Sequence, residues 1–151
     1  MRAIIGVGNV LLGDEGVGVH AARALLRRDL PSGVAVLDGG TEGLGLMDAI
    51  CGLERLVVID CVRGGQAPGT VYCFDWDELP RSRRRLATST SAHQVSLADV
   101  LDRVALVGDL PRTTVVGVEP ARLEMGLELS APVAARLEAV CDVALERCLG
   151  G

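Results

Sequence analysis

A glycine-rich turn between an apolar segment and an acidic one is the feature that most restricts how this chain can fold. Residues 2–7 (RAIIGV) are short, apolar and partly β-branched, and GVGNVLLGDEGVG runs from Gly6 to Gly18. An apolar run that ends in glycine predicts a buried strand, and acids after the glycines indicate a helix start. Glycine permits sharp turns and close approach of other groups. We therefore expect a strand, a tight turn and a helix, with Asp14 and Glu15 in the open at the mouth of the turn.

The alternation of strand and helix patterns continues along the chain. Helical spacing of apolar residues predicts a helix over 15–28 after the first strand. The other expected strands are 34–37, 55–59, 70–74 and 113–118, and the other expected helices are 44–53, 97–107 and one that begins after Ser130. Residues 61–69 are too short and too rich in glycine and proline for a crossover helix, so strand 70–74 should return antiparallel at an edge.

This order predicts a single α/β domain over residues 1–151. We expect a three-layer sandwich in which a five-stranded, mostly parallel twisted sheet carries helices on both faces. The composition agrees, because 49% of the residues are hydrophobic and only 2% are aromatic, a mix that suits aliphatic parallel strands buried on both faces. The length of 151 residues also suits one domain.

Charge and cysteine usage exclude several classes of partner. The net charge of -5 argues against binding to nucleic acid or to an anionic membrane surface, which both require a basic surface. No apolar run reaches the ~18 residues of a membrane span. The five cysteines have no CxxC spacing and are odd in number, so we expect reduced thiols in a cytoplasmic protein. No apolar stripe is left over once each helix face packs on the sheet, which favours a monomer.

Acidic residues follow the first three expected strands. They are Asp14 and Glu15, then Asp38, then Asp60. Ligands of open α/β sheets bind outside the carboxyl ends of the strands, near a switch in strand order. A dinucleotide is disfavoured because GxGxxG would need glycine where Leu11 stands, and because acids at a helix start repel phosphate. A cation is the better prediction.

One imidazole can join these carboxylates. His93 lies in the segment SAHQ just before the helix expected over 97–107. Glu15, Asp60 and His93 would supply oxygen and nitrogen ligands that suit zinc, nickel or a similar divalent ion, with one coordination position open. The alternative is that Glu15 stabilises a helix start, Asp60 caps a turn and His93 is a loop residue. Spacing alone leaves both interpretations open.

The remaining candidate residues are better explained by structural roles. Asp38 precedes Gly-Gly-Thr and is expected to bond nearby backbone amides as a turn former, with support of the metal ligands as the alternative. His20 lies inside the first helix and is expected to be exposed or half-buried. Cys61 has no adjacent histidine and is expected to pack at the end of its strand. The arginine-rich run 81–85 is expected to be a solvated loop, or else a contact for an acidic partner surface.

Five motifs in the same order resemble the nickel–iron hydrogenase maturation endopeptidases. They are GVGNVLLGDEGVG, DGGTEG at 38–43, VVIDCV at 57–62, SAHQVSLADVL at 91–101 and VVGVEP at 115–120. The resemblance implies a protease that removes a C-terminal extension from the hydrogenase large-subunit precursor after nickel insertion. The family's metal positions fall on Glu15, Asp60 and His93. The resemblance further implies that these residues recognise nickel already held by the precursor, with zinc as a stand-in.

Two other functions stay open beside this one. The chain could be a metal-binding or peptide-binding accessory domain that holds the immature subunit without cutting it. It could also be a nucleotide or phosphate-ester hydrolase on a similar fold, which the acids at the first helix disfavour.

Overall fold

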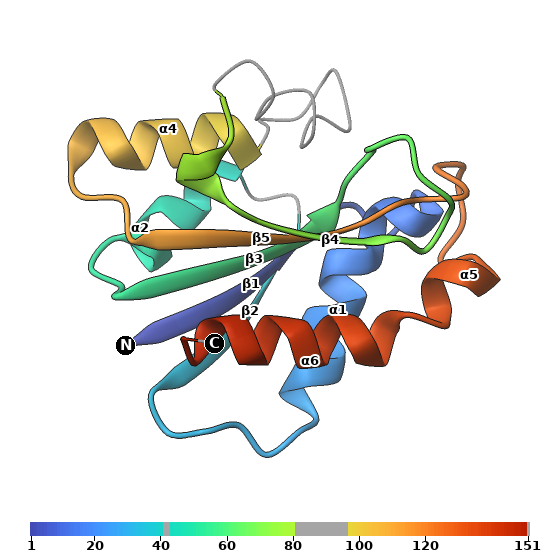
Figure 1. Cartoon of the computed structure of the whole chain (residues 1–151), viewed down its shortest axis with the longest axis horizontal. Coiled ribbons are helices and arrows are strands. Elements are labelled where there is room, and N and C mark those ends of the chain that lie inside the picture. Colours follow the sequence, from blue (N-terminus) through green and yellow to red (C-terminus); the bar gives the residue numbers. More distant parts are fainter. Residues whose placement is uncertain (41–42, 81–96, 151) are drawn as a thin grey trace.

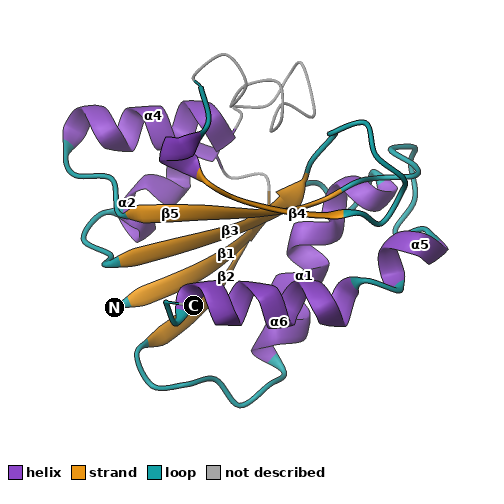
Figure 2. Ribbon diagram, in the orientation of Figure 1, coloured by secondary structure: helices purple, strands orange, loops and turns teal. Residues whose placement is uncertain are grey.

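The computed structural model describes residues 1–40, 43–80 and 97–150 and forms a sheet covered by helices on both faces (Figures 1 and 2). The strands are β1 Arg2–Val7, β2 Val34–Gly40, β3 Arg55–Cys61, β4 Val71–Asp75 and β5 Arg112–Val118. The α-helices are α1 Val17–Leu26, α2 Met47–Ile50, α4 Leu97–Val107, α5 Ala131–Ala134 and α6 Leu137–Cys148. Three short 3₁₀ turns are η1 Gly13–Gly16, η2 Gly43–Leu46 and η3 Trp76–Glu78.

The strand order places the ends of β1 and β3 side by side. The sheet runs β2-β1-β3-β5-β4, with β4 antiparallel to β5 at one edge and every other pair parallel. The chain goes from β1 outward to β2 and then back across to β3, so the strand order reverses between β1 and β3. The α/β architecture and the antiparallel edge strand expected over 70–74 are both confirmed, with β4 one residue later.

Two apolar layers flank the sheet. On one face, Ile4, Val57 and Val116 pack against α1 and α6. On the other face, Ile5, Val58 and Val115 pack against α2 and α4. Figure 1 shows this division, with α2 and α4 on one side of the strands and α1 and α6 on the other. Successive side chains of β1, β3 and β5 therefore point alternately into the two layers, as expected for strands that are buried on both faces.

The helix α1 packs directly on the strand ends because two glycines leave it room. A Cβ on Gly6 would overlap the backbone of Gly18, and a Cβ on Gly18 would overlap the carbonyl oxygens of Val7 and Ile59. Gly8 has φ +133°, a backbone conformation that favours glycine. The glycines thus bring backbone against backbone, which is the close approach expected of this stretch.

Several element boundaries differ from the sequence predictions. The helix expected over 15–28 begins as η1 and becomes α-helical only at Val17, and the helix expected over 44–53 shortens to η2 and α2. The last helix divides into α5 and α6. The strand β3 continues to Cys61, so Asp60 lies within the strand. No helix in the described part of the chain is long and apolar enough to cross a membrane.

Candidate functional site

Glu15 and Asp60 come together where β1 and β3 end. Glu15 lies in η1, directly after the turn that follows β1, and Asp60 is the penultimate residue of β3. The exposed fractions of these side chains are 1% and 3%. The charge of Glu15 is close enough to raise the pKa of Asp60. The structure therefore brings together two of the three predicted ligands, at the switch point where α/β folds bind ligands.

The environment of Asp60 opposes ionisation of its carboxyl group. Burial raises the pKa of Asp60 well above its usual range, and the negative charge of Glu15 adds to this effect. The backbone N–H of Cys61 donates a 2.8 Å hydrogen bond to Asp60 Oδ1 and acts in the opposite direction. The negative charge of Glu15 thus disfavours the charged form of Asp60, and a bound cation would relieve that repulsion.

Asp14 is buried, and so the expectation that both acids stand in the open is wrong. The exposed fraction of Asp14 is 1%. Its carboxylate accepts hydrogen bonds from the backbone N–H groups of Ala121, Arg122 and Ser130 and from the Ser130 hydroxyl, at 2.7–3.0 Å. Burial raises the pKa of Asp14, but these hydrogen bonds outweigh it and lower the pKa overall. Asp14 therefore holds the loop between β5 and α5 against the first turn.

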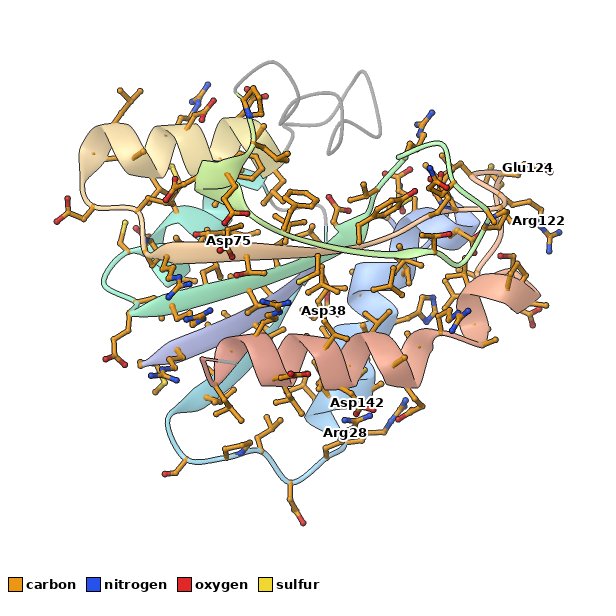
Figure 3. All side chains as sticks on the ribbon, viewed as in Figure 1. Arg28, Asp38, Asp75, Arg122, Glu124 and Asp142 are labelled. Carbon is orange, nitrogen blue, oxygen red and sulfur yellow. The ribbon has the colours of Figure 1, made fainter. Side chains whose placement is uncertain are left out.

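Asp38 has the hydrogen bond of a turn former. Its Oδ1 accepts a 3.1 Å hydrogen bond from the backbone N–H of Gly40, and its Oδ2 lies 3.1 Å from Nε of Arg23 on α1. Figure 3 labels Asp38 near α1. The bond to Gly40 is the one that the Asp-Gly-Gly pattern predicts. The alternative role of Asp38, support of the metal ligands, stays a prediction.

The third predicted ligand, His93, lies outside the described residues, as do the arginines at 81–85. In the part of the chain that the structure describes, no group of three or more His, Cys, Asp or Glu side chains is arranged to hold a metal ion. His20 is half-buried on α1, as expected. The burial of His20 and the charge of Arg23 lower its pKa, and a backbone hydrogen bond with Leu127 partly offsets them.

Cys61 is a packing residue, as predicted. Its side chain is fully buried in the layer under α1 and α6. Burial raises the pKa of the Cys61 thiol strongly, and the charges of Asp60 and Glu15 raise it further. A thiol with this pKa is a poor nucleophile near neutral pH.

Glu119 is a further anchor that the sequence predictions missed. It follows β5, and its Oε1 accepts hydrogen bonds from the Tyr72 hydroxyl at 2.6 Å and from the backbone N–H groups of Gly64 and Gln66. These bonds fix the segment that leaves β3 just beyond Asp60. The available signal was an acid directly after a strand, the same pattern that marked the other three positions.

The chain is similar to known proteins over most of its length. The family model described as hydrogenase maturation protease matches residues 19–147. The hydrogenase expression/formation protein HupM of Azotobacter chroococcum is 42% identical over 145 residues, which cover 94% of this chain and 68% of that protein. The hydrogenase 2 maturation protease of Escherichia coli is 38% identical over 149 residues, 97% of this chain and 87% of that protein.

The similarity extends to the three-dimensional structure. The hydrogenase maturating endopeptidase HybD from Escherichia coli superposes with a TM-score of 0.85 at 36% identity, and the match covers 97% of this chain and 91% of that one. A match of this extent, together with the family model over most of the chain, shows the family. The chain belongs to the hydrogenase maturation protease family.

Proposed function

We propose that this protein is an endopeptidase that removes the C-terminal extension of a nickel–iron hydrogenase large-subunit precursor after nickel insertion. We further propose that Glu15, Asp60 and His93 recognise the nickel that the precursor already carries. The observation that supports this proposal best is the pair of buried carboxyl groups, Glu15 and Asp60, at the switch point of the sheet. The protein would act in the cytoplasm as a monomer.

The chemistry of the ligands fits a divalent ion delivered from outside. Two carboxylates and one imidazole suit nickel or zinc and leave coordination positions for groups of the precursor. A metal held there supplies Lewis-acid polarisation of a carbonyl or a water molecule. The carboxyl groups of Asp60 and Glu15 would position the metal, because strand β3 orients Asp60 and the turn fixed by Asp14 orients Glu15. Strand alternation directs Asp60 to the face of Val58, where α4 begins at Leu97, four residues after His93.

The test is a mass measurement on nickel-loaded precursor incubated with the wild-type protein or with Glu15→Gln, Asp60→Asn or His93→Ala. Wild type should reduce the precursor mass by that of the extension. Each variant should cleave about 100-fold more slowly or worse, because loss of even an outer partner of a metal ligand costs 10- to 100-fold. Nickel-free precursor should stay intact.

A stability measurement on Asp60→Asn separates a recognition role from a folding role. The substitution removes a buried carboxyl group whose charged form is disfavoured by burial and by Glu15, so the free energy of unfolding should stay the same or rise. Undiminished cleavage by all three variants would refute the nickel-recognition proposal. A precursor that wild type binds but leaves at full mass would instead indicate an accessory domain.

A further inference from the structure

We infer that three exposed apolar side chains beside the candidate site form a docking surface for the immature hydrogenase subunit. Leu11, Met125 and Leu127 have exposed fractions of 54%, 84% and 65%, and we call them the tip patch. They belong to two segments, the turn after β1 and the loop between β5 and α5. This inference rests on the proposed function, because it adds a binding surface for the same precursor.

Backbone hydrogen bonds make the two segments of the tip patch one unit. The N–H of Gly126 donates to the carbonyl oxygen of Leu11, and the N–H of Gly13 donates to the carbonyl oxygen of Gly126, both at 2.9 Å. Leu12 and Gly126 pair as an isolated parallel bridge. Gly13 also begins η1, the turn that carries Glu15. The backbone that pairs with the tip patch at Gly13 therefore reaches Glu15 of the candidate site two residues later.

The loop is anchored at several points, while two of its apolar side chains, Met125 and Leu127, face water. Leu123 and Leu129 pack against the layer under α1 and α6 and anchor the loop at both ends. Asp14 ties the same loop down through Ala121, Arg122 and Ser130. Between these anchors, Met125 and Leu127 project outward. A loop that is already ordered loses little conformational entropy when a partner binds, which raises the affinity that its apolar area can give.

The surroundings of the tip patch have the composition of a protein interface. An open hollow of about 310 Å³ lies between Gly13 and the loop over residues 122–128. Arg122, Glu124 and Glu128 line this hollow beside the apolar side chains; Figure 3 labels Arg122 and Glu124 at this end of the molecule. An apolar centre with a charged rim is typical of protein–protein contacts, and methionine adapts well to a partner surface. The rim carries one more acid than base, which favours a partner with basic groups beside its apolar contact.

The occupant we propose is the precursor surface next to its nickel centre. A precursor that presents nickel to Glu15 must lie across this end of the molecule, because the tip patch and η1 share their backbone pairing. Exposed apolar side chains that gather at one place on a surface often mark a binding site. A second copy of this chain is the competing occupant, and the experiment below distinguishes the two.

The experiment compares two sets of serine substitutions in the full chain. The test variant carries Leu11→Ser, Met125→Ser and Leu127→Ser. The matched control carries Leu106→Ser and Val107→Ser, which replace side chains with exposed fractions of 85% and 72%. These residues end α4 at the opposite end of the molecule from the loop over residues 119–130 (Figure 1). A single Met125→Ser variant covers the case in which the triple variant folds poorly.

The readout is cleavage of nickel-loaded precursor at varied precursor concentration. The triple variant should raise KM about tenfold or more with little change in kcat, because it removes binding that the ground state and the transition state share. Met125→Ser should raise KM by a smaller factor, and the Leu106/Val107 control should match wild type. An unchanged KM in both the triple and the Met125→Ser variant, with wild type active, would overturn the docking surface alone. Failure of wild type to cleave would instead overturn the proposed function.

Sedimentation of the free proteins completes the test. The proposal expects wild type and the triple variant to sediment alike as monomers. A wild-type dimer that the triple variant abolishes would show that a second copy occupies the tip patch, and it would overturn the assignment of this surface to the precursor.

Discussion

Asp14 and Glu15 are neighbours in sequence, and the fold gives their carboxyl groups different tasks. Asp14 accepts four hydrogen bonds from the loop that follows β5. Glu15 lies where its charge acts on Asp60 across the end of β3. The first acid keeps its charge because backbone N–H groups replace water around it. The second stands beside another carboxyl group, an arrangement that is favourable once a cation arrives.

Substitution of Asp14 should loosen the fold as a whole. Asp14→Asn replaces one acceptor oxygen by an NH₂ group that faces hydrogen-bond donors. We expect the free energy of unfolding to fall by about 2–4 kcal/mol, because buried donors lose their charged acceptor. Urea unfolding measures this change. Asp38→Asn is the matched control, since Asp38 is exposed and receives a single backbone N–H bond, and it should cost less than about 1 kcal/mol. Equal losses in the two variants would contradict this account of Asp14.

His20 should make stability depend on pH. Its pKa in the folded protein lies below the ordinary value of about 6.5, because of burial and then the charge of Arg23. The unfolded chain therefore binds the proton more readily, and stability is lost as pH falls through that value. Above about pH 7.5 the His20 imidazole is neutral in both the folded and the unfolded protein, and its effect on stability vanishes. Urea midpoints measured from pH 8 to pH 5 should fall more steeply for wild type than for His20→Gln, and parallel profiles would count against this assignment.

At the scale of elements, contact between the helix α1 and the strand ends depends on glycine. Gly18 lies against the carbonyl oxygens of Val7 and Ile59, and Gly6 lies against Gly18 itself. The α1 start is thereby set by sterics at the ends of β1 and β3, which also fixes where η1 presents Glu15. A side chain at either glycine would push the helix away from the sheet.

Gly18→Ala should therefore destabilise the protein strongly. The added Cβ meets backbone atoms that cannot rotate aside, and we expect a loss of about 2 kcal/mol or more. Gly108→Ala is the control, because nothing lies within 4 Å of its added Cβ. Thermal unfolding of the two variants gives the comparison. A Gly18→Ala protein as stable as Gly108→Ala would show that α1 can shift without cost.

The elements that the sequence predicted well are those whose local residue pattern indicates whether they are buried. Every strand was located to within three residues at each end, because runs such as RLVVI are apolar on both faces. The meeting of Glu15 and Asp60 was one of two interpretations that the spacing left open, and it was favoured because ligands of α/β sheets bind at the carboxyl ends of the strands. The loop over residues 119–130 was not predictable, because its shape depends on bonds to Asp14 more than 100 positions away. The division of the last helix was missed as well, and no local signal at Ala135 or Arg136 marks it.

At the scale of the whole molecule, the two ends of the chain meet near the amino end of β1, whereas the candidate site lies at the carboxyl ends of the strands. A guanidinium nitrogen of Arg2 in β1 donates a 3.2 Å hydrogen bond to the carbonyl oxygen of Cys148, at the end of α6. Arg28, two residues beyond α1, bonds Glu138 and Asp142 of α6, and Figure 3 labels Arg28 beside Asp142. Because α1, α6 and β1 share one apolar layer, we expect this side of the molecule to unfold as one unit.

The cysteines report on that unit directly. Cys61, Cys141 and Cys148 are buried in the layer under α1 and α6, whereas Cys51 and Cys73 are exposed. Burial raises the pKa of Cys141 to about 11 and also raises that of Cys148, so these thiols are both covered and protonated. Brief thiol labelling of the native protein should modify the two exposed cysteines. Modification of the three buried ones should be slower by about a thousandfold or more, because it requires global opening.

Labelling at increasing urea concentration, with peptide mapping by mass spectrometry, tests whether the layer opens as a whole. The three buried thiols should become reactive together, at the midpoint that circular dichroism gives for unfolding. Cys148 gives the strictest test of single-unit unfolding, because it lies in the last turn of α6 and helix ends tend to fray. The hydrogen bond from Arg2 should suppress that fraying. If Cys148 reacts well below the midpoint while Cys61 and Cys141 stay protected, α6 opens separately from the sheet and the single-unit account is wrong.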